Sequence, residues 1–330
     1  MSWCAAMTIP TGATSVVFSS ADCHVELAGT FTEPQVNGPF PLAVMVPGSG
    51  ALDRDATSFG HQPFARLATE LCDLGVATLR YDKRGTGLSG GDLATAGIDD
   101  HVSDVMAAVD HVWSRRGPIG GPVGIIGHSE GAANATYAAA LGAQVDFLVL
   151  LAGAGVSGMD LLMEQHRRLS TAAGLSDEAC EEARELQDHV LRTVRDIDDY
   201  IRRAQLLKEL LAPMTDGHEL NTEIEQLASP WFQDFVRRDP TTALVQVACP
   251  VLAIWGDLDV QVPPELHVPA IRAVAPGSTV EVWPGVNHLF QQATTGLPDE
   301  YARLPEGMAG VAARVSSWLG QIGLLRRSTG

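Results

Sequence analysis

One serine of the chain lies in a sequence pattern that favours nucleophilic chemistry. Ser129 is the central residue of Gly127–Gly131, which has the pattern G-x-S-x-G. An apolar run, 123–126, precedes the pattern and an alanine-rich segment, 132–141, follows it, which predicts a strand, a sharp turn and a helix. Such a turn holds the serine hydroxyl clear of the sheet, and both glycines are needed because a β-carbon would collide with the neighbouring strand and helix. We therefore predict that Ser129 is a nucleophile.

A serine hydroxyl at its ordinary pKa needs a histidine to accept its proton and an acid to orient that histidine. His288 lies directly after the last apolar run, on a loop that can fold over the strand ends, and we predict that it is the base. His267, in a proline-rich segment read as a loop, is the weaker rival. Two further histidines fall on helical stripes and are predicted to be surface residues: His166 and His189.

Two aspartates follow the apolar run 250–255 and compete for the role of the acid. Asp259 lies three residues after Gly256, a G-x-x-D placement that reaches the histidine, whereas Asp257 fits a turn-capping role. We predict Asp259 as the acid.

Stabilisation of an oxyanion requires backbone N–H groups near the nucleophile. The turn places the N–H of Glu130 at a helix N-terminus, where it can donate to a developing negative charge. A second donor is expected from the glycine-rich loop after the run 42–46, in the N–H of Ser49, with Gly50 as the alternative. Gly48 and Gly50 are predicted to let the backbone approach the substrate.

The elements that must position these residues are indicated by the hydrophobic pattern. Alternation between residues 14 and 31 predicts an N-terminal antiparallel pair of strands. Fully apolar runs separated by helical segments predict a mostly parallel, doubly wound α/β sheet. The first four runs are 42–46, 76–81, 123–126 and 147–151, and two more follow at 250–255 and 279–283.

The alternation stops after residue 155, and leucine-rich stripes with helical spacing take its place. Ser176 begins one of these predicted helices. We predict a first part of the core over 1–155, a helical cap over 156–240, and the second part of the core over 241–330.

Composition excludes several classes of partner. A formal charge of −18 repels nucleic acid and acidic membrane surfaces. Five scattered cysteines without a C-x-x-C pair indicate neither disulfides nor zinc, and no glycine-rich phosphate loop is present, so we expect no metal and no cofactor. The N-terminus lacks the pattern of a secretory signal and no apolar run is long enough to span a membrane, which together favour a cytoplasmic protein.

These motifs together resemble the α/β-hydrolase superfamily, and within it the bacterial serine esterases of the acyl-esterase and dienelactone-hydrolase-like branch. The resemblance rests on 47–55, 81–89, the Ser129 turn, 229–232 and the loops of Asp259 and His288. It implies that 82–89 is a structural loop and that 229–232 returns the chain from the cap to the core. It also implies that Trp231 and Phe232 line an acyl pocket.

The expected activity is cofactor-independent hydrolysis of a carboxylic ester of a small or medium-sized molecule through an acyl-enzyme on Ser129. The same triad also suits a thioester, an amide, a lactone or a cyclising acyl transfer, and a ligand-binding protein on a hydrolase scaffold is the alternative of another class. The apolar stripes of the cap also allow a homodimer.

Overall fold

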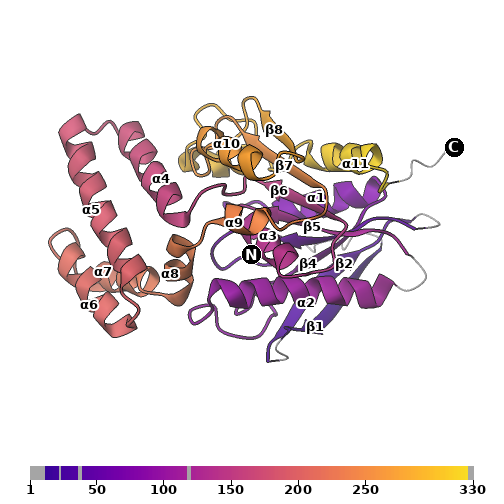
Figure 1. The fold of residues 1–330 in the computed structure, drawn as a ribbon, viewed down its shortest axis with the longest axis horizontal. Coiled ribbons are helices and arrows are strands. Elements are labelled where there is room, and N and C mark those ends of the chain that lie inside the picture. The colour runs from indigo at the N-terminus through magenta and orange to yellow at the C-terminus, as the bar shows by residue number, and fades with distance from the viewer. Residues whose placement is uncertain (1–11, 22–23, 36–38, 117–119, 326–330) are drawn as a thin grey trace, which may run out of the picture.

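An eight-stranded sheet runs through the centre of the computed structural model, which describes residues 12–21, 24–35, 39–116 and 120–325 (Figure 1). The strand order is β1-β2-β4-β3-β5-β6-β7-β8. β1 pairs with β2 and β2 with β4 in antiparallel fashion, and the remaining pairs are parallel. The strands are β1 (Ala13–Ser19), β2 (Glu26–Thr32), β3 (Leu42–Val46), β4 (Ala77–Tyr81), β5 (Val123–His128), β6 (Phe147–Leu151), β7 (Val251–Gly256) and β8 (Thr279–Trp283).

The five central strands, β3 to β7, are buried along their whole length. Strands that are apolar on both faces need helices on both faces, and two groups of helices supply them (Figure 1). One group contains α1 (Pro63–Asp73) and α11 (Val311–Gln321), and the other contains α2 (Ile98–Arg116), α3 (Glu130–Ala140), α9 (Pro240–Leu244) and α10 (Pro264–Val274). The predicted doubly wound α/β fold is confirmed. A short 3-10 helix, η2 (Pro298–Arg303), precedes α11.

Six helices lie between β6 and β7 in the chain, and the first five of them extend from one side of the sheet (Figure 1). These five are α4 (Gly158–Ala172), α5 (Asp177–Asp196), α6 (Tyr200–Leu211), α7 (Gly217–Leu227) and α8 (Pro230–Arg237). Their apolar faces form a hydrophobic cluster separate from that of the sheet, with Leu191, Val194 and Leu207 at its centre. Ser176 caps α5 by accepting from the N–H of Ala179, as its sequence predicts. We call α4 to α8 the cap helices.

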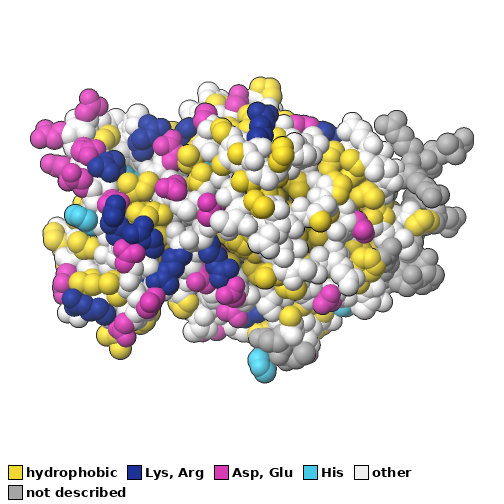
Figure 2. Space-filling view, in the orientation of Figure 1, with side chains coloured by type: hydrophobic (Ala, Val, Ile, Leu, Met, Phe, Trp, Pro, Cys, Tyr) yellow, Lys and Arg dark blue, Asp and Glu magenta, His cyan; other side chains and the backbone are white. Residues whose placement is uncertain are grey.

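Charged side chains gather over the cap helices on the face shown in Figure 2, whereas the neighbouring core surface is mostly uncharged. Several form ion pairs within one helix, such as Arg184 with Glu181 and Arg192 with Asp188. Exposed pairs of this kind add little stability, so the fold of the cap depends on its buried cluster.

Three cysteines lie in the described part of the chain, Cys72, Cys180 and Cys249, and each is a free thiol. Cys4, Cys23 and most of the N-terminal segment assessed for a secretory signal lie outside the described residues. Within the described ranges, no helix is both long and apolar enough to cross a membrane.

Candidate active site

The predicted nucleophile and the predicted oxyanion loop meet at the carboxyl ends of two neighbouring strands. β3 and β5 are paired in parallel, and their register sets Val46 opposite Gly127. The segments that follow the two strands, from Pro47 and from Ser129, therefore leave the sheet close to each other. The chain order also reverses here, because β4 lies beyond β3 and β6 beyond β5. Such a switch point is where open α/β sheets form their ligand crevice.

Ser129 occupies a sharp, strained turn. Its φ is 56° and its ψ is −123°, a backbone conformation that residues other than glycine rarely adopt. A β-carbon on Gly127 would lie 2.3 Å from the carbonyl oxygen of Gly131, and one on Gly131 would lie 2.1 Å from that of Val46. Both glycines are thus required by close approach to the following helix and to the end of β3, for the reason that the sequence predicts.

The oxyanion loop comes close enough to the turn to share a site with it. A β-carbon on Gly48 would lie 3.3 Å from Cβ of Ser129, so this position brings backbone against the nucleophile. The hydrogen bonds recorded among the described residues include none donated by the backbone N–H of Ser49 or of Glu130. Two N–H groups are thus available in the two segments that the sequence predicts to stabilise an oxyanion.

Asp259 and His288 are brought together from loops that are 29 residues apart in the chain. Nδ1 of His288 donates to Oδ2 of Asp259 at 2.8 Å, and the two side chains are buried. The other carboxylate oxygen accepts the backbone N–H groups of Gln261 and Val262, at 2.9 and 2.8 Å. These bonds fix the carboxylate, and the carboxylate fixes the imidazole with its proton on Nδ1, which leaves Nε2 as the proton acceptor.

The rival aspartate has a structural role. Asp257 is exposed, and its Oδ1 accepts the N–H of Gly285 at 2.7 Å, which ties the loop after β7 to the loop after β8. This agrees with the turn-capping role predicted for it.

The structure corrects the prediction for His267. This residue lies in helix α10 rather than in a loop, and it is fully buried. Its Nδ1 accepts the N–H of Gly155 at 2.9 Å, and burial lowers its pKa to about 4. His267 therefore holds the segment after β6 as a neutral side chain. His166 is partly buried in α4, and His189 is exposed on α5, in line with the surface role predicted for the latter.

Three residues that hold the loop of His288 are not predicted from the sequence: Asn287, Gln291 and His128. The side chain of Asn287 accepts the N–H groups of Leu289 and Gln291, each at 3.0 Å, and donates to Oε1 of Gln291 at 2.9 Å. The third residue is His128, which precedes the nucleophile. Its Nε2 lies 2.9 Å from the carbonyl oxygen of His288. The signal for His128 was available, since it is the first variable position of the G-x-S-x-G pattern.

A cavity of about 210 Å³ opens beside Ser129. Trp231 and Phe232 both line it, and the segment 229–232 begins α8, whose Trp231 packs against both the cap cluster and the core of the sheet. Most of the remaining wall is apolar and comes from both the core and the cap: Ile98, Ala133, Ala154, Val156, Leu161, Leu162, Phe235, Pro240 and Val262.

A second cavity of about 520 Å³ adjoins the first. It shares Ser49, Gln226 and Trp231 with the first cavity, and its other lining residues include Gly50 and Lys83. Of the two glycines predicted to contact substrate, Gly50 thus faces this second cavity, while Gly48 is held against Ser129.

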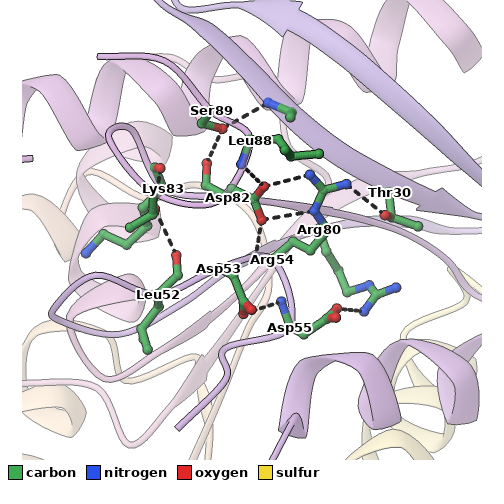
Figure 3. Close-up of polar contacts among 12 residues, drawn as sticks. Thr30, Leu52, Asp53, Arg54, Asp55, Arg80, Asp82, Lys83, Leu88 and Ser89 are labelled. Carbon is green, nitrogen blue, oxygen red and sulfur yellow. Dashed lines mark hydrogen bonds and ion pairs between the residues drawn. The ribbon is translucent and has the colours of Figure 1, made fainter. Parts of the chain in front are cut away.

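The loop after β4 fastens the oxyanion loop to the sheet (Figure 3). The carboxylate of Asp82 accepts the backbone N–H of Arg54 at 2.7 Å and forms a two-pronged pair with its guanidinium. Burial opposes ionisation, yet the bonds from Arg54 and Leu88 hold the pKa of Asp82 below its ordinary value. Arg80 pairs with Asp55 beside it. The Asp-Arg-Asp ending of the oxyanion loop thus supplies partners for charges on the sheet.

In the described part of the chain, no three His, Cys, Asp or Glu side chains are gathered as metal ligands would be.

The strand, strained serine turn and helix at a switch point of an α/β sheet define a serine hydrolase of the α/β-hydrolase fold. The chain belongs to the family described as serine aminopeptidase, S33, whose profile matches residues 61–292. It is 26% identical over 307 residues to esterase EstD of Thermotoga maritima, an alignment that covers 92% of this chain and 68% of that protein. The family and this relative make the chain an esterase-type serine hydrolase.

Solved structures show the same fold. A thermophilic esterase from Thermogutta terrifontis is similar with a TM-score of 0.55 at 20% identity, over 94% of this chain and 99% of that one. Dienelactone hydrolase from Anabaena variabilis gives a TM-score of 0.54 at 17% identity, over 96% of this chain and all of the other. The two neighbours are thus described as an esterase and a dienelactone hydrolase, and what this chain shares with them is the fold.

Proposed function

We propose that this protein hydrolyses carboxylic esters of small or medium-sized molecules through an acyl-enzyme on Ser129. The observation that carries the proposal is the buried hydrogen bond between Asp259 and His288, with His288 joined through His128 to the strand end that presents the serine. This arrangement supplies a nucleophile, a base and an orienting acid in the chain order of an α/β-hydrolase.

In the first half of the reaction, Oγ of Ser129 attacks the ester carbonyl carbon and Nε2 of His288 accepts the hydroxyl proton. The carbonyl oxygen becomes an oxyanion and accepts the N–H groups of Ser49 and Glu130. Asp259 stabilises the imidazolium. His288 then gives its proton to the leaving alcohol oxygen as the bond to the carbonyl carbon breaks. In the second half, water attacks the acyl carbon and loses a proton to His288, which then gives that proton to Oγ of Ser129 as the bond between Oγ and the acyl carbon breaks.

The cavity beside Ser129 is mostly apolar, and its basic lining residue, Arg238, is already paired with Asp99 at 2.8 Å, which favours an uncharged acyl group. Its acidic lining residue is Glu130, whose carboxylate already lies 3.5 Å from Nζ of Lys83 and accepts from Asn134 at 3.1 Å. The family description names an aminopeptidase, and recognition of a free α-amino group would require a carboxylate available to pair with it. Oε1 of Glu130 is held by these two partners, and Oε2, which has no hydrogen-bond partner among the described residues, is buried away from the cavity space, which favours an ester over an amino-terminal peptide bond.

The test compares the wild-type chain with Ser129→Ala on p-nitrophenyl acetate and butyrate. We expect turnover in the wild type and a loss of at least about 10⁴-fold in the variant, with the melting temperature retained. A fluorophosphonate probe should label the wild type and not the variant. Turnover that persists in Ser129→Ala would reject the proposal, and a wild type that is neither active nor labelled would favour a ligand-binding protein instead.

Two further parts of the proposal concern the protein in its cell. We propose a cytoplasmic location, which free thiols at Cys72, Cys180 and Cys249 support. A homodimer formed through the cap is proposed from its exposed apolar residues, such as Ile201 in α6 and Met214 between α6 and α7. Light scattering after size-exclusion chromatography tests the dimer.

A further inference from the structure

A buried lysine lies between the two halves of the proposed oxyanion hole. The side chain of Lys83 is 5% exposed, and its Nζ donates to the carbonyl oxygen of Gly48 at 3.1 Å and to Oε1 of Glu130 at 3.5 Å. One bond goes to the loop after β3 and the other to the first residue of helix α3. A buried ammonium is costly unless it is paired and hydrogen-bonded, so these two contacts define where the charge can lie.

The contact with Gly48 fixes the direction of the Ser49 N–H. The carbonyl of Gly48 and the N–H of Ser49 belong to the same peptide unit, which is planar and trans, so the two groups point in opposite directions. A cation that holds the carbonyl oxygen therefore aims the N–H away from itself. It also polarises the peptide, which strengthens that N–H as a donor.

The contact with Glu130 acts on the second donor. The N–H of Glu130 is the other proposed oxyanion donor, and its carboxylate is held at Oε1 by Lys83 and by Nδ2 of Asn134 at 3.1 Å. One ammonium group is thus bonded to the peptide unit that carries the first donor and to the side chain of the residue that carries the second.

The backbone of Lys83 is itself anchored to the same loop (Figure 3). Its N–H donates to the carbonyl oxygen of Leu52 at 3.3 Å, and the preceding Asp82 holds Arg54 through three hydrogen bonds. The side chain of Lys83 therefore extends from a fixed backbone, so that little conformational freedom of this side chain is lost when substrate binds.

From these contacts we infer that Lys83 is a positioning residue of the oxyanion hole, which holds the N–H groups of Ser49 and Glu130 at the separation that a tetrahedral oxyanion requires. The inference rests on the proposed function and deepens it. Lys83 contacts the reacting atoms only through Gly48 and Glu130.

The test removes the bridge without leaving a buried charge unpaired. Lys83→Met alone would strand the carboxylate of Glu130, so it is combined with Glu130→Gln, which keeps the backbone N–H and an amide in place of the carboxylate. We expect kcat on p-nitrophenyl butyrate to fall about 10- to 100-fold, since misplacing an oxyanion donor costs less than removing one. KM should stay within about twofold, because glutamine keeps the size of the Glu130 side chain that lines the acyl cavity. The pH at half-maximal kcat should stay within about 0.3 pH units, because His288 is untouched.

A transition-state analogue separates this role from a merely structural one. Oγ of Ser129 adds to the carbonyl carbon of a trifluoromethyl ketone and gives its proton to His288, which leaves a tetrahedral oxyanion on the inhibitor. The inhibition constant should therefore rise by the same factor by which kcat/KM falls. Thr222→Val is the matched control, because Thr222 lines the same 520 Å³ cavity from helix α7. It should keep the wild-type kcat and inhibition constant.

A folded double variant with kcat within twofold of the wild type overturns the inference, and so does a loss of activity without weaker inhibition by the ketone. Both results leave the proposed function standing, provided that the wild type is active and Ser129→Ala is not. Activity that persists in Ser129→Ala is the separate result that rejects the proposed function itself.

Discussion

The ring of His128 is joined to the backbone of His288 across 160 residues of sequence. Nε2 of His128 lies 2.9 Å from the carbonyl oxygen of His288, and the two ring centroids are 4.8 Å apart. A carbonyl oxygen only accepts, so Nε2 must carry the proton. Burial lowers the pKa of His128 to about 3, which keeps the ring neutral and the bond in place across the working pH range. The residue before the nucleophile thus holds the loop of the base.

Loss of this bond should misplace the base. In His128→Phe, the carbonyl of His288 loses its buried donor, and we expect kcat to fall about 10- to 100-fold and stability by about 1–3 kcal/mol. His128→Gln retains an N–H donor of similar reach and should recover most of both. Steady-state kinetics and urea unfolding measure the two effects, and equal damage from Phe and Gln would rule out the hydrogen bond as the cause.

Substitutions of the two aspartates after β7 should differ sharply in their effect on activity. Asp259→Asn presents an amide to Nδ1 of His288 and favours the wrong tautomer, so kcat should drop about 10³- to 10⁴-fold. Asp257→Asn keeps an oxygen for the N–H of Gly285 and should retain near-wild-type kcat. Initial rates on p-nitrophenyl butyrate measure kcat for both variants. Comparable losses in both variants would contradict the assignment of Asp259 as the acid.

The size of the acyl group should respond to Ala133, which lies on α3 one turn after Ser129 and lines the 210 Å³ cavity. Ala133→Leu fills part of this space. We expect kcat/KM for p-nitrophenyl octanoate to fall at least about 10-fold more than that for the acetate, since each methylene in such a pocket contributes about 1–3 kcal/mol. Ala139→Leu lies on the same helix outside the lining and should leave the ratio unchanged. An unchanged ratio in Ala133→Leu would exclude this cavity as the acyl site.

Acid should destabilise the fold through its buried histidines. In the folded chain, burial lowers the pKa of His101 and of His267 to about 4 and that of His128 to about 3. In the unfolded chain, the pKa of each of these histidines returns to about 6.5. Between these values the unfolded chain binds more protons than the folded one, so stability is lost as the pH falls below about 6.5. Each histidine contributes a slope of up to about 1.4 kcal/mol per pH unit.

Urea unfolding at pH 7.5, 6.0 and 5.0 measures this slope. His267→Gln removes one titrating ring and keeps an acceptor for the N–H of Gly155, so its stability should fall less steeply with acid than that of the wild type. A urea midpoint that is the same at pH 7.5 and 5.0 in the wild type would show that the buried histidines do not govern acid stability.

Local sequence was sufficient for most elements because the periodicity of burial is a local property. The runs at 42–46 and 147–151 are strands at the predicted bounds, and the serine turn follows from two glycines between a strand and a helix. The error at His267 has a physical origin. Pro264 was read as part of a loop, yet proline is favoured in the first turn of a helix, and the buried residues Pro264, His267, Val268 and Ile271 have helical spacing.

The sequence by itself determined the kind of chemistry, because the G-x-S-x-G turn is specified by steric limits on a few adjacent residues and the acid and base follow in chain order. Only the tertiary structure decided how these parts are held. Lys83 against Gly48 and Glu130, and His128 against His288, are contacts between segments far apart in the chain. No local pattern encodes them, since they arise from the register of β3 with β5 and from loops that meet only once the sheet has formed.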